Sequence, residues 1–367
     1  MNLPSYFEDF LNNIRPEADE REAYKESHNT LRENLLKDDK INKITVDTFL
    51  QGSYRRNTAI KADGLNRSDV DVVVVTTINK ENPASKALEY FEPFCERHYP
   101  KRWKKNDRSI GISLDDVDID LVVTAAPSEA AEELLKSNWA KAERPPVQLS
   151  NARQIRSWIA KGAPDNFNLN DLKTDSDETL DWRKDPLLIP DRKFEKWEET
   201  HPLAQIEWTW EKNAKCNGHY INVVKAIKWW KRKHKTLPKH PKGYPLEHFI
   251  GATCPDGINS VAEGILQSLE QIAMIHPRKP KLPDHGVPHH DVFHRTTEQE
   301  YAMFHGEIKI AARLARKAYD ATTVEESAKA WRELFGEEFP APEDDNKSSG
   351  GFTSRTGPST VKEGRFG

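Results

Sequence analysis

The sequence has few cysteines, no long apolar run and no excess of basic residues. Its three cysteines, Cys95, Cys216 and Cys254, form neither a closely spaced pair nor an even set, which argues against a disulfide framework and favours a reducing cytoplasm. The longest apolar run, at 70–75, is interrupted by an aspartate and is far shorter than the ~20 residues that span a bilayer. The N-terminal MNLPSYFEDF lacks the basic start and apolar centre of a signal peptide. We therefore expect a cytoplasmic protein with no membrane partner.

The net charge is also low, at −4 over 367 residues. A chain without a global basic field does not recruit DNA or RNA, so we expect no nucleic-acid polymer as a partner. Any site for a polyanion must be local. The 10 tryptophans and 14 phenylalanines supply material for a sizeable core, and the length suggests about two domains.

Hydrophobic periodicity divides the chain into regions of different structure. Apolar positions recur at helical spacing over 4–38, with Pro16 between two helices. Segments rich in β-branched residues follow (KITVDTFL, SDVDVVVVTT, SIGISL and VDIDLVVTA), and the segment between the second and third predicts one helix. The pattern is helical again from His201. We predict an α+β fold in four parts: N-terminal helices that brace both domains (1–40), a sheet domain with a poorly ordered insertion at 127–200 (41–200), a helical domain (201–340) and a disordered tail (341–367).

Two of the predicted strands carry pairs of acids in apolar surroundings. Residues two apart in a strand share a face, so Asp69 and Asp71 project side by side, and Asp118 and Asp120 repeat the pattern. Neighbouring carboxylates repel each other unless they are protonated or bridged by a cation. If the strands are adjacent, three of these acids supply the oxygen ligands of Mg²⁺, and two such ions clamp the oxygens of a phosphoryl-type displacement. Spacing does not choose between Asp118 and Asp120, and an isolated pair would suit a solvated sheet edge.

Gly52 and Ser53 form a turn directly after the first strand. A glycine at a strand exit lets backbone N–H groups approach an anion, and the serine hydroxyl adds a donor. The alternative is that Ser53 only caps a helix. Arg55 and Arg56 follow, and we expect at least one of them to be solvated.

Further along, residues 219–235 predict an amphipathic helix with Lys225, Lys228 and Arg232 opposite its apolar face. That basic face is either solvated or in contact with an anion. His285, His289, His290 and Asp291 include zinc-ligand types, but no cysteine pair or helical His-x-x-x-His accompanies them. We interpret residues 285–291 as a polar loop, and the sequence leaves metal binding there open.

Three segments in order, GSYRRNTAI, SDVDVVVV and DIDLVVTA, resemble the polymerase-β-like nucleotidyltransferases. The signature of that family is a Gly-Ser turn, an acid-x-acid strand and a third acid on a later strand, which Asp120 matches better than Asp118. Within the family, the chain resembles the cGAS/DncV-like nucleotidyltransferases (CD-NTases), relatives of oligoadenylate synthetase, although Val123 stands where they often have proline. The resemblance implies a sheet domain plus a helical domain of the oligoadenylate-synthetase type.

The resemblance also implies roles for individual residues. Asp69, Asp71 and Asp120 would be the catalytic acids that hold two Mg²⁺ ions, and Gly52 and Ser53 would hold the terminal phosphates. Two further residues would bind nucleotide from the helical domain: Lys228, in IKWW, matches a lysine that touches the triphosphate, and Tyr244, in the segment GYPLEHFIGA, matches a tyrosine that stacks on a base. Tyr244 packing as an ordinary amphipathic ring is the alternative. We interpret Glu247, in the same segment, as structural.

The segments HPLAQIEW and KNAKCNGHYIN resemble clade D of these enzymes, which is associated with cyclic trinucleotides of adenine and guanine. The implied activity joins ATP and GTP without a template into a cyclic messenger, which activates an effector in CBASS anti-phage defence. An E1/E2-like ligase conjugates the C-terminal residue in many such operons, and Gly367 would take that role here unless the tail has no partner. A linear oligonucleotide, RNA or small-molecule nucleotidyltransferase needs the same acids, and a catalytically silent scaffold is the remaining alternative.

Overall fold

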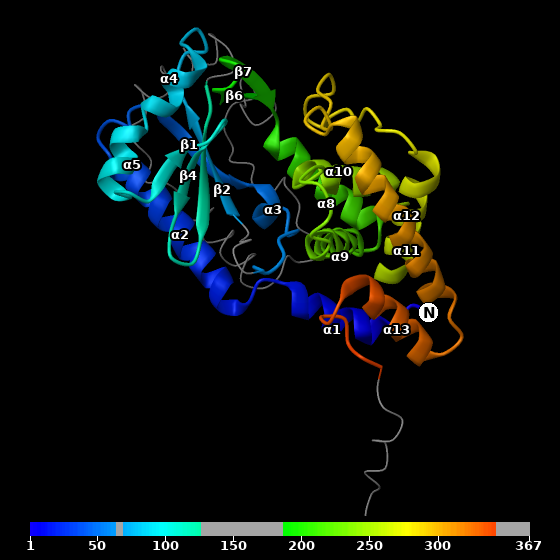
Figure 1. Ribbon diagram of the computed structural model, residues 1–367. Helices are drawn as coiled ribbons and strands as arrows, with labels where there is room; N and C mark the ends of the chain where they lie inside the picture. The colour runs from blue at the N-terminus through cyan, green and yellow to red at the C-terminus, as the bar shows by residue number, and fades with distance from the viewer. Residues whose placement is uncertain (64–68, 126–185, 343–367) are drawn as a thin grey trace, which may run out of the picture.

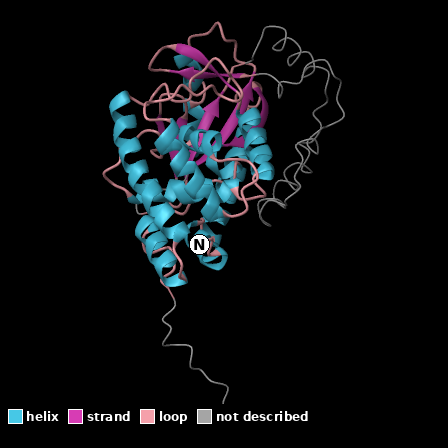
Figure 2. Ribbon diagram, turned by 90° about the vertical axis from the view of Figure 1, so that its right-hand side faces the viewer, coloured by secondary structure: helices cyan, strands magenta, loops and turns pink. Residues whose placement is uncertain are grey.

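The computed structural model describes residues 1–63, 69–125 and 186–342. The predicted insertion up to residue 185, and the predicted tail from residue 343 to Gly367, lie outside these ranges. A sheet-containing lobe and a helical lobe lie side by side, with the short helix α3 (Gly52–Arg55) between them (Figure 1). After a 90° turn, Figure 2 shows the strands gathered at one end of the molecule and helices at the other. Within the described ranges, no helix combines the length and apolar composition needed to cross a bilayer.

A five-stranded sheet forms the centre of the first lobe. The parallel pair β2–β5 lies inside an otherwise antiparallel sheet, and its register places Asp71 beside Asp120 and Asp69 beside Asp118. The strands, in spatial order, are β1 (Thr45–Gln51), β2 (Asp69–Thr76), β5 (Asp118–Val123), β4 (Ile110–Ser113) and β3 (Trp103–Lys105).

The valines of β2 are buried on both faces of the sheet. Val70, Val72 and Val74 pack against the helices of one face, α2 (Ala18–Lys37), α4 (Ala84–Glu89) and α5 (Glu92–His98). The last two helices replace the single helix that the sequence predicted.

Val73 and Val75 point to the opposite face, where they pack with Leu187 of a two-stranded hairpin. This hairpin consists of β6 (Leu187–Asp191) and β7 (Lys196–Thr200). The prediction that 127–200 is poorly ordered throughout is therefore wrong for its last part. The apolar valines explain the difference, because the hairpin removes them from water.

The second lobe consists of α-helices packed around α9 (Tyr220–Lys233), whose Trp229 and Trp230 are buried. The N-terminal helix α1 (Pro4–Ile14) joins this lobe, and its Phe10 ring stacks on Phe335 with 4.6 Å between the ring centroids. Because α2 packs on the sheet instead, the two N-terminal helices contact different lobes. The other helices are α8 (Pro202–Lys215), α10 (Tyr244–Thr253), α11 (Val261–Ile275), α12 (Glu298–Asp320) and α13 (Val324–Phe335).

Candidate active site

A cleft of about 930 Å³ lies between the two lobes. Gly52, Ser53, Asp69 and Asp71 line its wall on the sheet side. The opposite wall comes from α9 and the segment after it, which contribute a row of cations: Lys228, Lys231, Arg232, Lys235, Lys239 and Lys242. The chain thus concentrates positive charge in one concave place although its net charge is −4. Such a cleft is suited to a small polyanion.

Asp69, Asp71 and Asp120 come together at the cleft end of β2 and β5. One carboxylate oxygen from each lies within 4.8 Å of the other two, whereas Asp118 is outside this cluster. Burial raises the pKa of Asp71 well above its ordinary value, and the nearby charges of Asp69 and Asp120 raise it further. Burial and Asp69 likewise raise the pKa of Asp120. A divalent cation would remove this repulsion, and three hard oxygen ligands fit one.

Asp120 is fixed in place by two side chains of the β3–β4 turn. Its Oδ1 accepts hydrogen bonds from Asn106 Nδ2 at 3.0 Å and from Ser109 Oγ at 3.1 Å. These bonds leave the second carboxylate oxygen for another ligand. Sequence reasoning missed Asn106 and Ser109, because nothing in their local pattern indicates which strand they will face.

Gly52 is required at its position by the carboxylate of Asp71. Its φ is +73°, and a Cβ built there would lie 1.8 Å from Asp71 Oδ2. Only glycine adopts this positive φ readily and also leaves room for the Asp71 carboxylate. The structure therefore adds a second reason for glycine beside the expected approach to an anion.

We expect Gly52→Ala to lower the rate of nucleotide joining by about 10²-fold, because the new methyl group displaces a carboxylate in the cluster by more than about 1 Å. Gly218→Ala is the matched control, since Gly218 has φ +80° with no atom within 4 Å of a new Cβ. Both variants experience backbone strain, but only the first disturbs Asp71. Pyrophosphate release measures the rate. Equal rates in the two variants would contradict the predicted role of Asp71 as a catalytic acid.

The residues after Gly52 are more buried than the sequence suggested. Arg55 is 7% exposed and Arg56 is 5% exposed, so the expectation that at least one of them is solvated is wrong. Arg56 is buried against the helical lobe, where it donates a hydrogen bond to Glu247. Ser53 of α3 lines the cleft, and its backbone oxygen accepts a hydrogen bond from Thr58 N at 2.8 Å.

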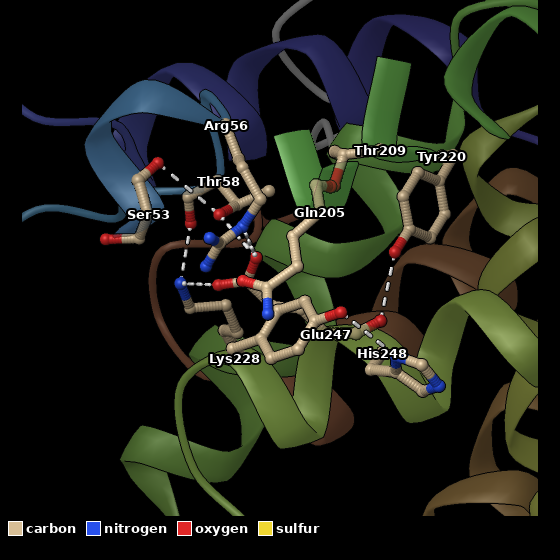
Figure 3. A network of polar contacts seen from close by, with 10 residues as sticks. Ser53, Arg56, Thr58, Gln205, Thr209, Tyr220, Lys228, Glu247 and His248 are labelled. Carbon is tan, nitrogen blue, oxygen red and sulfur yellow. Dashed lines mark hydrogen bonds and ion pairs between the residues drawn. The ribbon is translucent and has the colours of Figure 1, made fainter. Parts of the chain in front are cut away.

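Glu247 of α10 connects the two lobes beside the cleft (Figure 3). Its Oε2 accepts hydrogen bonds from Arg56 Nε at 3.0 Å and Thr58 Oγ1 at 2.8 Å, and its Oε1 accepts one from Lys228 Nζ at 2.8 Å. Lys228 Nζ also donates to the backbone oxygen of Thr58 at 2.8 Å. Burial alone would raise the pKa of Glu247, but the charges of Arg56 and Lys228 outweigh it and lower the pKa to about 2. Glu247 is therefore ionised at neutral pH and fixes both cations.

The basic side of α9 is not a solvated face. Lys225 is 3% exposed, and its burial lowers its pKa to about 7. Lys228 retains only 13% side-chain exposure, directed to the cleft. The solvated alternative is therefore wrong, because the turn after β1 packs against this side of the helix.

Tyr244, the first residue of α10, lines the cleft. The guanidinium carbon of Arg56 lies 5.1 Å from its ring centroid, and its hydroxyl lies 3.2 Å from His248 Nδ1. The tyrosine is thus held from both sides while it borders the cleft.

Comparisons with known proteins show the family of the chain. Residues 1–131 match the family model described as Second Messenger Oligonucleotide or Dinucleotide Synthetase domain. A probable cyclic AMP-AMP-GMP nucleotide synthase of Salmonella paratyphi B is 42% identical, and the cyclic AMP-AMP-GMP synthase of Enterobacter hormaechei subsp. hoffmannii (strain UCI 50) is 41% identical, each with 100% of both chains covered.

The solved structure of CdnC with ATP from E. coli MS115-1 superposes with a TM-score of 0.63 at 14% identity, covering 93% of this chain and 100% of that one. At that identity the likeness concerns the fold, which is the predicted sheet domain plus helical domain. The full-length relatives establish the family. The chain belongs to the cGAS/DncV-like nucleotidyltransferases (CD-NTases) of CBASS, enzymes that synthesise cyclic oligonucleotide second messengers.

Proposed function

We propose that this enzyme joins ATP and GTP into a cyclic trinucleotide that contains adenine and guanine. Two full-length relatives above 40% identity carry the name of a cyclic AMP-AMP-GMP synthase, which supports this product. The signalling role we propose is the one implied for the family, activation of an effector in anti-phage defence. The observation that carries the proposal is the meeting of three carboxylates with Gly52 on the wall of a basic cleft.

We further propose that Asp69, Asp71 and Asp120 hold two Mg²⁺ ions. When bound, the ions neutralise phosphate charge and make a ribose hydroxyl more acidic. Asp69 and Asp71, whose carboxylates meet in the cluster, would be ligands of these ions. Asp120, oriented by its two hydrogen bonds, would be a further ligand and would accept the proton of the attacking hydroxyl.

The remaining residues bind and orient the nucleotide. The turn of Gly52 and Ser53 offers backbone N–H groups and the Ser53 hydroxyl to the terminal phosphates. Lys228 presents its ammonium group from the opposite wall, where it stabilises the charge of the departing pyrophosphate. Tyr244 offers a ring face for stacking on a base.

Incubation with radiolabelled ATP and GTP, followed by phosphatase treatment and mass spectrometry, tests the proposal. We expect a phosphatase-resistant product with the mass of a cyclic trinucleotide, formed only with a divalent cation. The Asp69→Asn/Asp71→Asn double variant should form none. A product with phosphatase-labile ends would indicate a linear polymerase. Pyrophosphate release that the double variant leaves unchanged would contradict the catalytic role of both acids.

A further inference from the structure

A second group of metal-ligating side chains, distinct from the three aspartates, includes residues that line the same cleft. Glu199 comes from β7 in the sheet lobe, whereas His289 and His290 come from the loop between α11 and α12 in the helical lobe. One potential ligand atom from each of the three lies within 4.8 Å of the other two. We propose that these three residues bind a zinc-class divalent cation that joins the two lobes.

The ligand types distinguish this group from the catalytic cluster. Two imidazoles and one carboxylate suit Zn²⁺, which commonly takes three such ligands and keeps a fourth position for water. Three carboxylates instead suit Mg²⁺. The sequence alone favoured a polar loop because neither a cysteine pair nor a helical histidine spacing was present. The third ligand comes from Glu199, about 90 residues earlier in the chain, and no local pattern reveals it.

The loop that carries the histidines is held by its own hydrogen bonds. Asp284 Oδ1 accepts hydrogen bonds from the backbone N–H groups of Gly286 at 2.8 Å and Val287 at 3.2 Å. The Asp284 N–H donates to the backbone oxygen of His290 at 2.9 Å, which closes the loop on itself. The two imidazole rings are therefore presented from a fixed backbone, with 4.6 Å between their centroids. A preformed backbone lowers the entropy cost of binding an ion.

The close packing of this loop against the end of β7 depends on Gly286. A Cβ on Gly286 would lie 2.3 Å from His201 Cβ and 2.9 Å from the His201 backbone oxygen. Only a glycine permits the loop to pack this closely against the residues that follow β7. Glu199 Oε2 already lies 3.0 Å from His289 Nε2, and both side chains are accessible, at 42% and 68% exposure. An ion can therefore enter from solvent without rearrangement of the core.

The position of the site gives the ion a role. Glu199 and His290 both line the cleft, so an ion between them ties the hairpin to the helical lobe. It limits how far the two lobes separate, and its ligands are not the three aspartates.

Zinc binding to the full-length, metal-stripped protein tests the proposal by calorimetry. The titrations use zinc sulfate with excess Mg²⁺ in the Asp69→Asn/Asp71→Asn background, so that the catalytic cluster contributes little. We expect one zinc per chain, and at least about 100-fold weaker binding in His290→Ala and in Glu199→Gln, since each loses a direct ligand. His294→Ala is the matched control, because His294 is an exposed histidine of the same loop outside the group.

A second readout does not depend on calorimetry or on catalysis. Zinc should raise the melting temperature of the parent protein and of His294→Ala, and should leave that of His290→Ala unchanged. Equal metal-free melting temperatures of the variants would show that each is folded. Absence of zinc binding at 100-fold excess over protein, or equal affinity in the parent and His290→Ala, would overturn the proposal.

Discussion

Asp71→Asn is expected to reduce cyclic oligonucleotide synthesis by at least about 10³-fold, since it removes a ligand of ions that stabilise the transition state by several kcal/mol. The same change should stabilise the metal-free protein. Burial and two neighbouring carboxylates raise the pKa of Asp71, so its ionised form is unfavourable in the folded state. If removal of this unfavourable charge adds about 1 kcal/mol to the free energy of unfolding, the melting temperature rises by about 2–4 °C at neutral pH.

The pH dependence of this difference follows from linkage. A carboxyl group whose pKa is raised by folding stabilises the protein at low pH, and the stabilisation is lost as pH rises through the folded-state pKa. The metal-free wild type should therefore lose stability as the pH rises above about 4, while Asp71→Asn should lose less. Saturating Mg²⁺ should reverse the order of the two proteins.

Asp118→Asn is the matched control for both measurements. Asp118 pairs in register with Asp69 but lies outside the cluster, so its variant should retain activity and melt like the wild type. Thermal denaturation over a pH series and product formation measure the two effects. A strong loss of activity in Asp118→Asn with retention in Asp71→Asn would show that the third acid and its partners are assigned to the wrong residues.

Of the predicted substitutions, Glu247→Ala should cause the largest fall in the free energy of unfolding. The change leaves Arg56 and Lys228 near each other without their shared carboxylate, where the side chain of Arg56 is buried. Removing one partner of a buried ion pair costs about 3–5 kcal/mol, which corresponds to a fall in melting temperature of about 10 °C. Activity should fall as well, because Lys228 loses the group that holds it toward the cleft.

Two further variants separate the charge of Glu247 from its hydrogen bonds. Thr58→Val removes a single hydrogen bond to the same carboxylate and should cost about 1 kcal/mol. Glu247→Gln keeps the shape of the side chain but not its charge, so its loss should lie between the other two. Circular dichroism at the assay temperature identifies folded variants. A Glu247→Ala protein as stable as Thr58→Val would show that the ion pairs contribute little.

The sequence predicted the parts of the site that depend on strand periodicity and on order along the chain. Asp69 and Asp71 share a face because they are two residues apart, and Asp120 lies beside Asp71 because the strands pair in parallel. The pairing partner of each strand is a tertiary property, which is why spacing did not separate Asp118 from Asp120.

Other features depended on contacts between lobes that no local pattern reports. Arg56 and Lys225 look like solvated charges in sequence, yet both are buried, and each donates a hydrogen bond to a residue of the other lobe. Glu247 appeared structural, and it proved to be the shared partner of Arg56 and Lys228. Its role could not be found from spacing, because its partners lie in segments far apart in the chain. The hairpin at 187–200 was missed because short strands of mixed polarity give a weak signal.

The parallel pairing of β2 with β5 also bears on how the enzyme is made. Asp71 leaves the ribosome well before Asp120, since two helices and two strands intervene. In a nascent chain that ends before β5, the acidic, valine-rich strand β2 can therefore pair only with β1. Non-local pairing of this kind is slow, so the three aspartates cannot meet before β5 has been made, and truncated chains that end before β5 should be inert and prone to aggregate.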